Sequence, residues 1–127
     1  MPFAQPSLGL KLLTDTRVVV ASGWCQGADA RDDDGAAVEP WDDNATCWSL
    51  LGAIVSVLEH EARTQGEVPL DELAAALYAL AAVLETDSLV DWNDAPGRMQ
   101  DEVLTVLAAA EREYEPPWPE TARPHPN

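Results

Sequence analysis

The chain has 127 residues, of which 46% are hydrophobic, and its 7 basic and 23 acidic residues give a formal net charge of −16. This length fits one domain with a substantial core, while the charge excludes direct binding to nucleic acid phosphates and favours a partner protein with a basic surface. No apolar run reaches the roughly 18 residues of a membrane span and no signal peptide is recognisable, so we expect no membrane contact and a cytoplasmic location.

The first predicted element is an amphipathic helix that ends at Gly23, indicated by Leu8, Leu12, Leu13 and the run 18–21. Its valine triplet at 18–20 leaves a short strand open as an alternative, because β-branched residues suit strands. In the helical interpretation, Gly23 would end the helix as a left-handed cap.

A short β-hairpin is predicted near residues 28–39, because Asp34-Gly35 is a strong two-residue turn signal. The acidic run that ends at this turn also resembles a calcium-binding loop. However, placing Gly35 at the sixth loop position puts Ala30 at the first and Trp41 at the twelfth, where carboxylates are required. We therefore expect a solvated hairpin tip and no metal site.

The central element is predicted to be a helix over about residues 45–64, because apolar residues run almost all the way round it. Its main stripe consists of Trp48, Leu51, Val55, Leu58 and Ala62. Residues 42–44 would lie at its N-terminus, where acidic and amide side chains are favoured, and Gly66 would stop it.

Two further helices are predicted. Pro69 opens the first, whose stripe we expect to pack against Leu51, Val55 and Leu58 of the central helix. That stripe consists of Leu70, Leu73, Leu77, Leu80 and Leu84. Residues 86–97 are predicted as a loop, and the last helix follows with Val103, Val106, Leu107 and Ala110 on its apolar face.

The fold class that follows is mainly α: a small helical domain packed around a central helix. We expect this single domain to span residues 1–114 and the proline-rich segment 115–127 to be a disordered tail. The sequence leaves the oligomeric state open.

Three short segments carry a resemblance: Gly-Trp-x-Gln-Gly at 23–27, Trp-x-x-x-Gly-Ala at 48–53 and Trp-Asn-Asp at 92–94. With these motifs the chain resembles a family of small uncharacterised actinobacterial and phage-associated proteins, a domain of unknown function. The resemblance implies no activity. In the family pattern a cysteine often follows the tryptophan at position 48, whereas here Ser49 stands there, which argues against a cysteine nucleophile.

Catalytic groups are not evident. Glu59, His60 and Glu61 are consecutive, so on a helix they point about 100° apart and cannot converge on one substrate atom. Cys47 falls in the first turn of the predicted central helix, which would favour a thiolate, but the acids at 42–43 oppose it. Buried packing is the favoured interpretation of Cys25 and Cys47, and we expect no catalytic residue and no cofactor.

Two candidate sites remain. Loop aromatic and amide side chains could line a ligand pocket or instead pin the loops to the central helix; they are Trp24, Gln26, Trp48, Trp92 and Asn93. Aspartates at expected loops and helix ends are the candidate partner-binding residues: Asp29, Asp32, Asp33, Asp34, Asp42, Asp43, Asp87, Asp91 and Asp94.

The favoured functional hypothesis is an acidic, non-catalytic binding protein, including the case of a phage-type inhibitor that mimics nucleic acid and occupies a basic groove of a host protein. Two alternatives stay open. One is a small-molecule-binding or hydrolytic domain that uses the tryptophan-bearing loops, and the other is a structural module.

Overall fold

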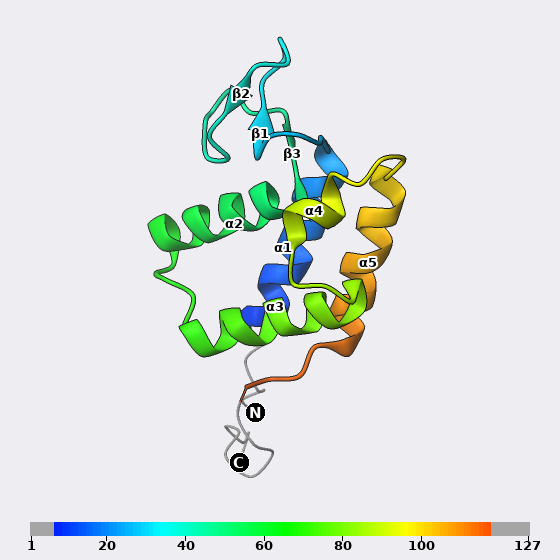
Figure 1. Cartoon of the computed structure of the whole chain (residues 1–127). Coiled ribbons are helices and arrows are strands. Elements are labelled where there is room, and N and C mark those ends of the chain that lie inside the picture. Colours follow the sequence, from blue (N-terminus) through cyan, green and yellow to red (C-terminus); the bar gives the residue numbers. More distant parts are fainter. Residues whose placement is uncertain (1–6, 118–127) are drawn as a thin grey trace.

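The computed structural model describes residues 7–117, which form five helices and a small three-stranded sheet (Figure 1). The helices are α1 (Leu8–Ser22), α2 (Leu50–Thr64), α3 (Leu70–Leu84), α4 (Leu89–Asn93) and α5 (Gln100–Glu113). The strands are β1 (Ala30–Arg31), β2 (Ala37–Val38) and β3 (Cys47–Trp48). The predicted mainly α fold is confirmed.

The helix in the middle of the packing is α1, which contacts α2, α3 and α5. Its residues Leu12, Leu13 and Val20 are almost fully buried. They meet the buried side chains of the neighbouring helices in a single hydrophobic core, to which these residues contribute: Leu50, Ile54, Val57, Leu80, Leu84, Val103 and Leu107. The valine triplet therefore belongs to a helix, and the strand alternative is wrong.

The predicted central helix is shorter than expected and buries a different face. It begins at Leu50 rather than near residue 45, and Ser49 caps it by accepting a hydrogen bond from the backbone N–H of Gly52 at 3.0 Å. Its buried positions are Leu50, Gly52, Ala53, Ile54, Val57 and Glu61. The predicted stripe is only partly buried, and its last residue, Ala62, is exposed.

The expected packing of this helix on the leucine stripe of α3 is wrong. α2 instead packs on α1 and also contacts α4, while α3 packs on α1 and α5. On α3, Leu80 is fully buried, Leu77 is partly buried and Leu70 is 82% exposed. The physical reason is that apolar residues nearly encircle α2, so periodicity alone does not choose its contact face.

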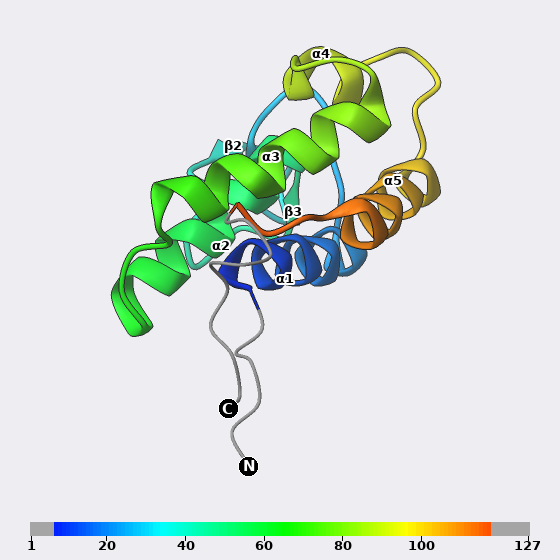
Figure 2. The same ribbon diagram turned by 90° about the horizontal axis from the view of Figure 1, so that it is seen from below.

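Side chains from other helices close both ends of α1. At its start, the carboxylate of Glu72 on α3 accepts the N–H of Leu8 at 2.9 Å and the hydroxyl of Ser7. At its end, the amide of Gln100 donates to the carbonyl of Val20 at 2.8 Å. Seen from below, the start of α1 lies beside α3 and the segment that follows α5 (Figure 2). These contacts fix α1 at both ends.

The predicted hairpin is confirmed. β1 pairs with β2 in antiparallel register, with Ala30 opposite Val38, and Gly35 adopts the left-handed backbone of the turn at φ 83°. Prediction from sequence missed β3, which pairs with the other edge of β1. Residues 42–44, expected at a helix start, therefore lie in the connection before β3.

Two local predictions are corrected. Gly23 is extended, with φ 173°, and does not form a left-handed cap. A side chain there would collide with the carbonyl oxygen of Thr46, so glycine allows the chain to pass close to the segment before β3. The expected loop over residues 86–97 contains the short helix α4, which Ser88 caps.

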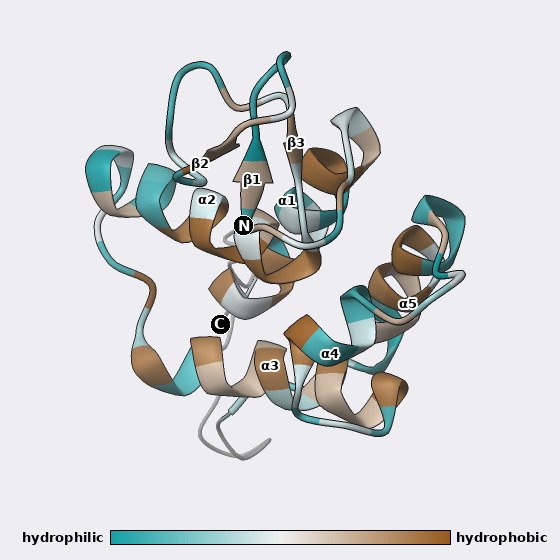
Figure 3. Ribbon diagram, turned by 45° about the horizontal axis from the view of Figure 1, so that its top comes forward, coloured by the Kyte–Doolittle hydropathy of each residue, from teal (hydrophilic) through white to brown (hydrophobic). Residues whose placement is uncertain are grey.

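The sheet and its loops form one end of the molecule, beyond the end of α1 and the start of α2 (Figure 1). Figure 3 shows strongly hydrophilic residues in these loops. Helix α5 ends at Glu113 and residues 114–117 form no helix or strand, while most of the predicted tail lies outside the described residues. No helix within residues 7–117 combines the length and apolar character needed to cross a membrane.

Candidate functional site

Asn93 is the buried hydrogen-bonding centre of the sheet end. Its side-chain oxygen accepts the indole N–H of Trp24 at 2.7 Å and the backbone N–H of Leu50 at 3.0 Å. Its side-chain nitrogen donates to the carbonyl of Cys25 at 3.1 Å and to the carboxylate of Asp94 at 3.0 Å. These four bonds use the whole capacity of one amide, so the Asn93 side chain has no donor or acceptor left for a ligand.

The other candidate pocket residues do not line one common pocket but make contacts in different parts of the sheet end. Gln26 joins Asn93, because its amide donates to the carbonyls of Asn93 and Ala95 at 2.9 and 3.0 Å. Trp92 lies under the guanidinium of Arg98, 3.8 Å from the ring centroid. Trp48 donates its indole N–H to the carbonyl of Pro40 at 2.9 Å. Trp24, Gln26 and Asn93 thus come together, and they hold the loops against α2 and α4.

The aspartates of the sheet end lie at the surface. Asp29, Asp33, Asp34 and Asp43 are exposed. Asp32 and Asp42 are partly buried because each closes a turn: Asp32 accepts the N–H groups of Asp34 and Ala36, and Asp42 accepts that of Asn44. All six belong to the segment between α1 and α2.

Asp94, the residue that follows α4, joins this group. Its carboxylate accepts the backbone N–H of Gly27 at 3.0 Å, and together with Asp29 it lines a depression of about 140 Å³. Asp87 and Asp91 are exposed but belong to α4 and the connection before it. We call the set Asp29, Asp32, Asp33, Asp34, Asp42, Asp43 and Asp94 the acidic surface.

Four of the basic residues within 7–117 form ion pairs with other acids, while Arg31 donates to the carbonyls of Gly35 and Gln26. Lys11 pairs with Asp15 and Glu61, and Arg17 pairs with Glu111 at 2.6 Å. The two remaining pairs join Arg63 to Glu59 and Arg98 to Glu102. Within residues 7–117, no aspartate of the acidic surface forms an ion pair. Arg31 is the one cation of the segment between α1 and α2, so the seven carboxylates leave the surface with an excess of negative charge.

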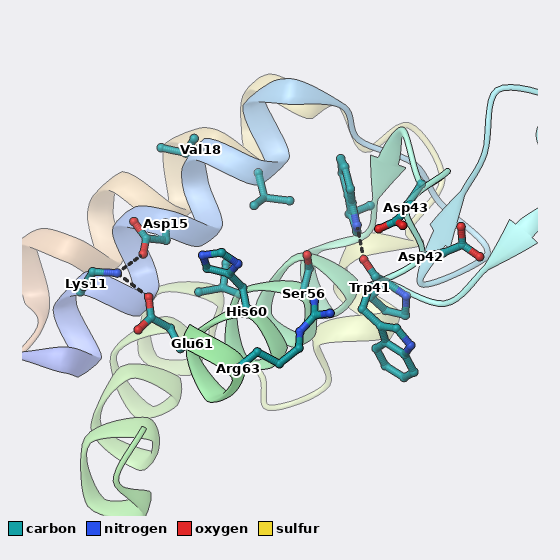
Figure 4. A pocket seen from close by; sticks show the side chains of 15 residues that line it. Lys11, Asp15, Val18, Trp41, Asp42, Asp43, Ser56, His60, Glu61 and Arg63 are labelled. Atoms are coloured by element: carbon teal, nitrogen blue, oxygen red, sulfur yellow. Dashed lines mark hydrogen bonds and ion pairs between the residues drawn. The ribbon is translucent and has the colours of Figure 1, made fainter. Parts of the chain in front are cut away.

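A groove of about 560 Å³ lies beside the acidic surface, between α1, α2 and the connection from β2 to β3 (Figure 4). We call it the tryptophan groove, since Trp41 and Trp48 both line it. Asp42 and Asp43 belong to its rim, while Lys11, Asp15 and Glu61 lie at the other end. The sequence did not indicate this groove, because its walls come from segments far apart along the chain.

The ion pairs at the far end of the groove neutralise its only lysine. The Lys11 ammonium lies 2.7 Å from Asp15 and 2.5 Å from Glu61. The hydrogen bonds that the ammonium donates to these two carboxylates raise the pKa of Lys11 above its usual value. His60 also lines the groove, but its side chain has no hydrogen-bond partner within residues 7–117 that would orient it as a general base.

The two cysteines lie close together in the sheet segment and not on a helix. Cys47 belongs to β3, so the predicted position in the first turn of a helix is wrong. Burial, followed by the neighbouring Cys47 thiol, raises the pKa of Cys25 to about 12. A thiol with such a pKa stays protonated near neutral pH and is a poor nucleophile.

Within residues 7–117, no three His, Cys, Asp or Glu side chains gather as a metal site would require. The comparisons with known proteins add a family: a model described as "Family of unknown function (DUF6197)" matches residues 9–113. This range includes all three motifs noted in the sequence. No curated protein and no solved structure matches the chain.

Proposed function

Because the chain belongs to the DUF6197 family, whose function is unknown, we propose a function from its surface: an acidic, non-catalytic protein that binds a basic surface of another protein. The observation that carries the proposal is the acidic surface. Six of its seven aspartates lie on the segment between α1 and α2, and the seventh, Asp94, follows α4. Within residues 7–117 none of the seven forms an ion pair. Uncompensated charge attracts an oppositely charged partner and speeds its association.

The structure of this segment supports a binding role over a purely solubilising one. The Asn93 hydrogen bonds hold the loop after α1 against the start of α2, and the turns at Asp32 and Asp42 are closed by their own carboxylates. The aspartates are therefore presented on an ordered framework. A charged surface that is already ordered loses less entropy on binding than a flexible one.

The finer form of the proposal is nucleic acid mimicry. In this form the carboxylates take the place of phosphates in the basic groove of a host protein, and the chain acts as an inhibitor of the phage-associated type. Basic grooves that bind phosphates do so mainly through charge, so a suitably spaced set of carboxylates competes for them. We expect this interaction in the cytoplasm, where Cys25 and Cys47 remain reduced.

The test compares two variants with the same change in net charge. The first replaces Asp29, Asp33 and Asp34 by lysine; these residues are exposed, and their side chains accept no hydrogen bond within residues 7–117. The matched control replaces Glu67, Glu113 and Glu115 by lysine; these glutamates are exposed elsewhere on the molecule. Asp32 is left intact because its carboxylate closes the hairpin turn.

Partners are captured from the native host by pull-down and identified by mass spectrometry, and each captured protein is then purified and titrated. We expect the first variant to lose most of its affinity and the control to keep it. Nucleic acid should displace the wild-type chain if mimicry holds. Equal losses of affinity in both variants would argue against an acidic binding surface. A complex in which the partner binds the chain and nucleic acid together would argue against mimicry.

A further inference from the structure

The tryptophan groove combines an aromatic wall, an apolar floor and an acidic rim. Trp41 is 45% exposed and Val18 is 61% exposed, so both leave apolar surface open to a ligand in the groove. Val19 and Val57 complete the apolar lining, and Asp43 stands at the rim (Figure 4). Such a surface suits a ligand that has both apolar and positively charged parts.

The charges around the groove favour a cation at the Trp41 end. Lys11 is neutralised by its two carboxylates, whereas Arg63, which lies 3.9 Å from Glu59 and is largely exposed, keeps one positive charge on the groove wall. Asp42 and Asp43 have no such partner within residues 7–117. An indole face next to unpaired carboxylates attracts a guanidinium through its ring electrons and through charge.

The chain already contains one arrangement of this kind. Arg98 stacks on Trp92 at 3.8 Å and pairs with the carboxylate of Glu102 at 3.2 Å. Within residues 7–117 it is the only cation stacked on an aromatic ring, so the exposed indole of Trp41 has no equivalent partner from its own chain. This comparison indicates arginine rather than a compact ammonium, because a planar guanidinium can stack and pair at the same time.

The volume of about 560 Å³ lies in the range of sites that hold a ligand larger than one side chain. We propose that the tryptophan groove binds an arginine-containing segment of the basic partner protein, with the guanidinium on Trp41 beside Asp42 and Asp43 and a neighbouring apolar side chain on Val18 and Val19. This inference rests on the proposed function, since the bound arginine would belong to the same basic partner protein.

The test uses a capped peptide, acetyl-Gly-Arg-Leu-Gly-amide, and the same peptide with citrulline in place of arginine. Citrulline keeps the shape of the side chain and removes its charge. Binding is followed by NMR at the indole N–H of Trp41, which is assigned from the spectrum of a Trp41→Phe variant. We expect the arginine peptide to shift this signal and the citrulline peptide to bind at least about fivefold more weakly.

Three variants locate the site. The double change Asp42→Asn and Asp43→Asn should weaken the arginine peptide about fivefold or more, and asparagine keeps the acceptor oxygen that Asp42 uses in its turn. The matched double change Asp33→Asn and Asp34→Asn should leave the affinity unaltered. Arg63→Gln should strengthen binding, because it removes a positive charge from the groove wall.

Equal binding of the arginine and citrulline peptides would overturn the inference and point to an uncharged small molecule as the occupant. Absence of any shift at Trp41 would also overturn it. The proposed function fails separately. If the Asp29, Asp33 and Asp34 lysine variant loses the partner while Trp41→Phe and the asparagine variants keep it, the acidic surface stands and the groove proposal fails. If the arginine peptide binds at Trp41 but the partner complex has no salt dependence, the proposed function fails, and the groove remains an arginine site without its assigned partner.

Discussion

At the scale of single residues, Asn93 connects the separate segments of the sheet end through four hydrogen bonds. It is fully buried, and its amide joins the loop after α1, the start of α2 and the following Asp94. The sequence predicted Asn93 as a residue that ties loop amides, from its position before Asp94 and a Pro-Gly pair. It did not reveal Trp24, Cys25 and Leu50 as partners, because they lie more than 40 residues away along the chain.

We expect Asn93→Ala to lower the free energy of unfolding by about 2 to 5 kcal/mol, since it leaves the Trp24 indole and the Leu50 N–H without their acceptor. Urea denaturation measures the change. Asn44→Ala serves as the control: Asn44 is exposed, so the midpoint should move little. An unchanged midpoint for Asn93→Ala would show that the hydrogen bonds of this residue are dispensable.

Cys25 is expected to react slowly. Burial raises its pKa from 9.0 to about 12, so near pH 8 the folded chain holds much less Cys25 thiolate than the unfolded chain. Alkylation by iodoacetamide, followed in a Cys47→Ser variant, should therefore be fast only in denaturant. Burial is the main cause of the shift and persists in that variant. Labelling of the folded chain at the rate of a free thiol would contradict this.

The same shift has a consequence for stability. As the pH rises above 9, Cys25 ionises in the unfolded chain but stays protonated in the folded one, so its contribution lowers the free energy of unfolding up to about pH 12. The raised pKa of Lys11 acts in the same direction, since its ion pairs are lost when the ammonium deprotonates. Thermal melts between pH 8 and about 11 should show a falling melting temperature, and Cys25→Ser should reduce the fall.

At the scale of elements, the sequence predicts the turns and helix starts that are determined by neighbouring residues along the chain. The hairpin follows from Asp34-Gly35 and the start of α3 from Pro69, and both are confirmed. The predictions of where α2 begins and which face it buries were wrong, for two reasons. Residues 47–48 are taken by the backbone pairing of β3 with β1, and the apolar surface of α2 is too wide for periodicity to select one face.

Helix α3 offers a matched pair of leucines that tests the observed packing. Leu80 is fully buried in the core, whereas Leu70 is 82% exposed. Leu80→Ala should cost about 2 to 5 kcal/mol, and Leu70→Ala should change the stability by less than about 0.5 kcal/mol. Chemical denaturation gives both values. Similar effects for the two variants would mean that α3 presents another face to α1 and α5.

At the scale of the whole molecule, the predicted class of small helical domain is confirmed, and its charge distribution could be anticipated only in part. Composition gives the total charge of −16, and turn signals place many aspartates in loops. Composition does not tell which carboxylates the chain neutralises itself. The fold decides this, because Lys11 reaches Glu61 and Arg17 reaches Glu111 only when the helices are packed. The acidic surface and the tryptophan groove both depend on that packing.

If the acidic surface binds a basic partner, the association rate between the chain and its captured partner must depend on salt. Exposed charges are screened over about 8 Å at physiological ionic strength. The wild-type rate should therefore fall steeply between about 50 and 200 mM salt. The lysine variant of Asp29, Asp33 and Asp34 should associate slowly at every salt concentration, while the control variant of Glu67, Glu113 and Glu115 should follow the wild type. A wild-type rate that does not change with salt would contradict the account.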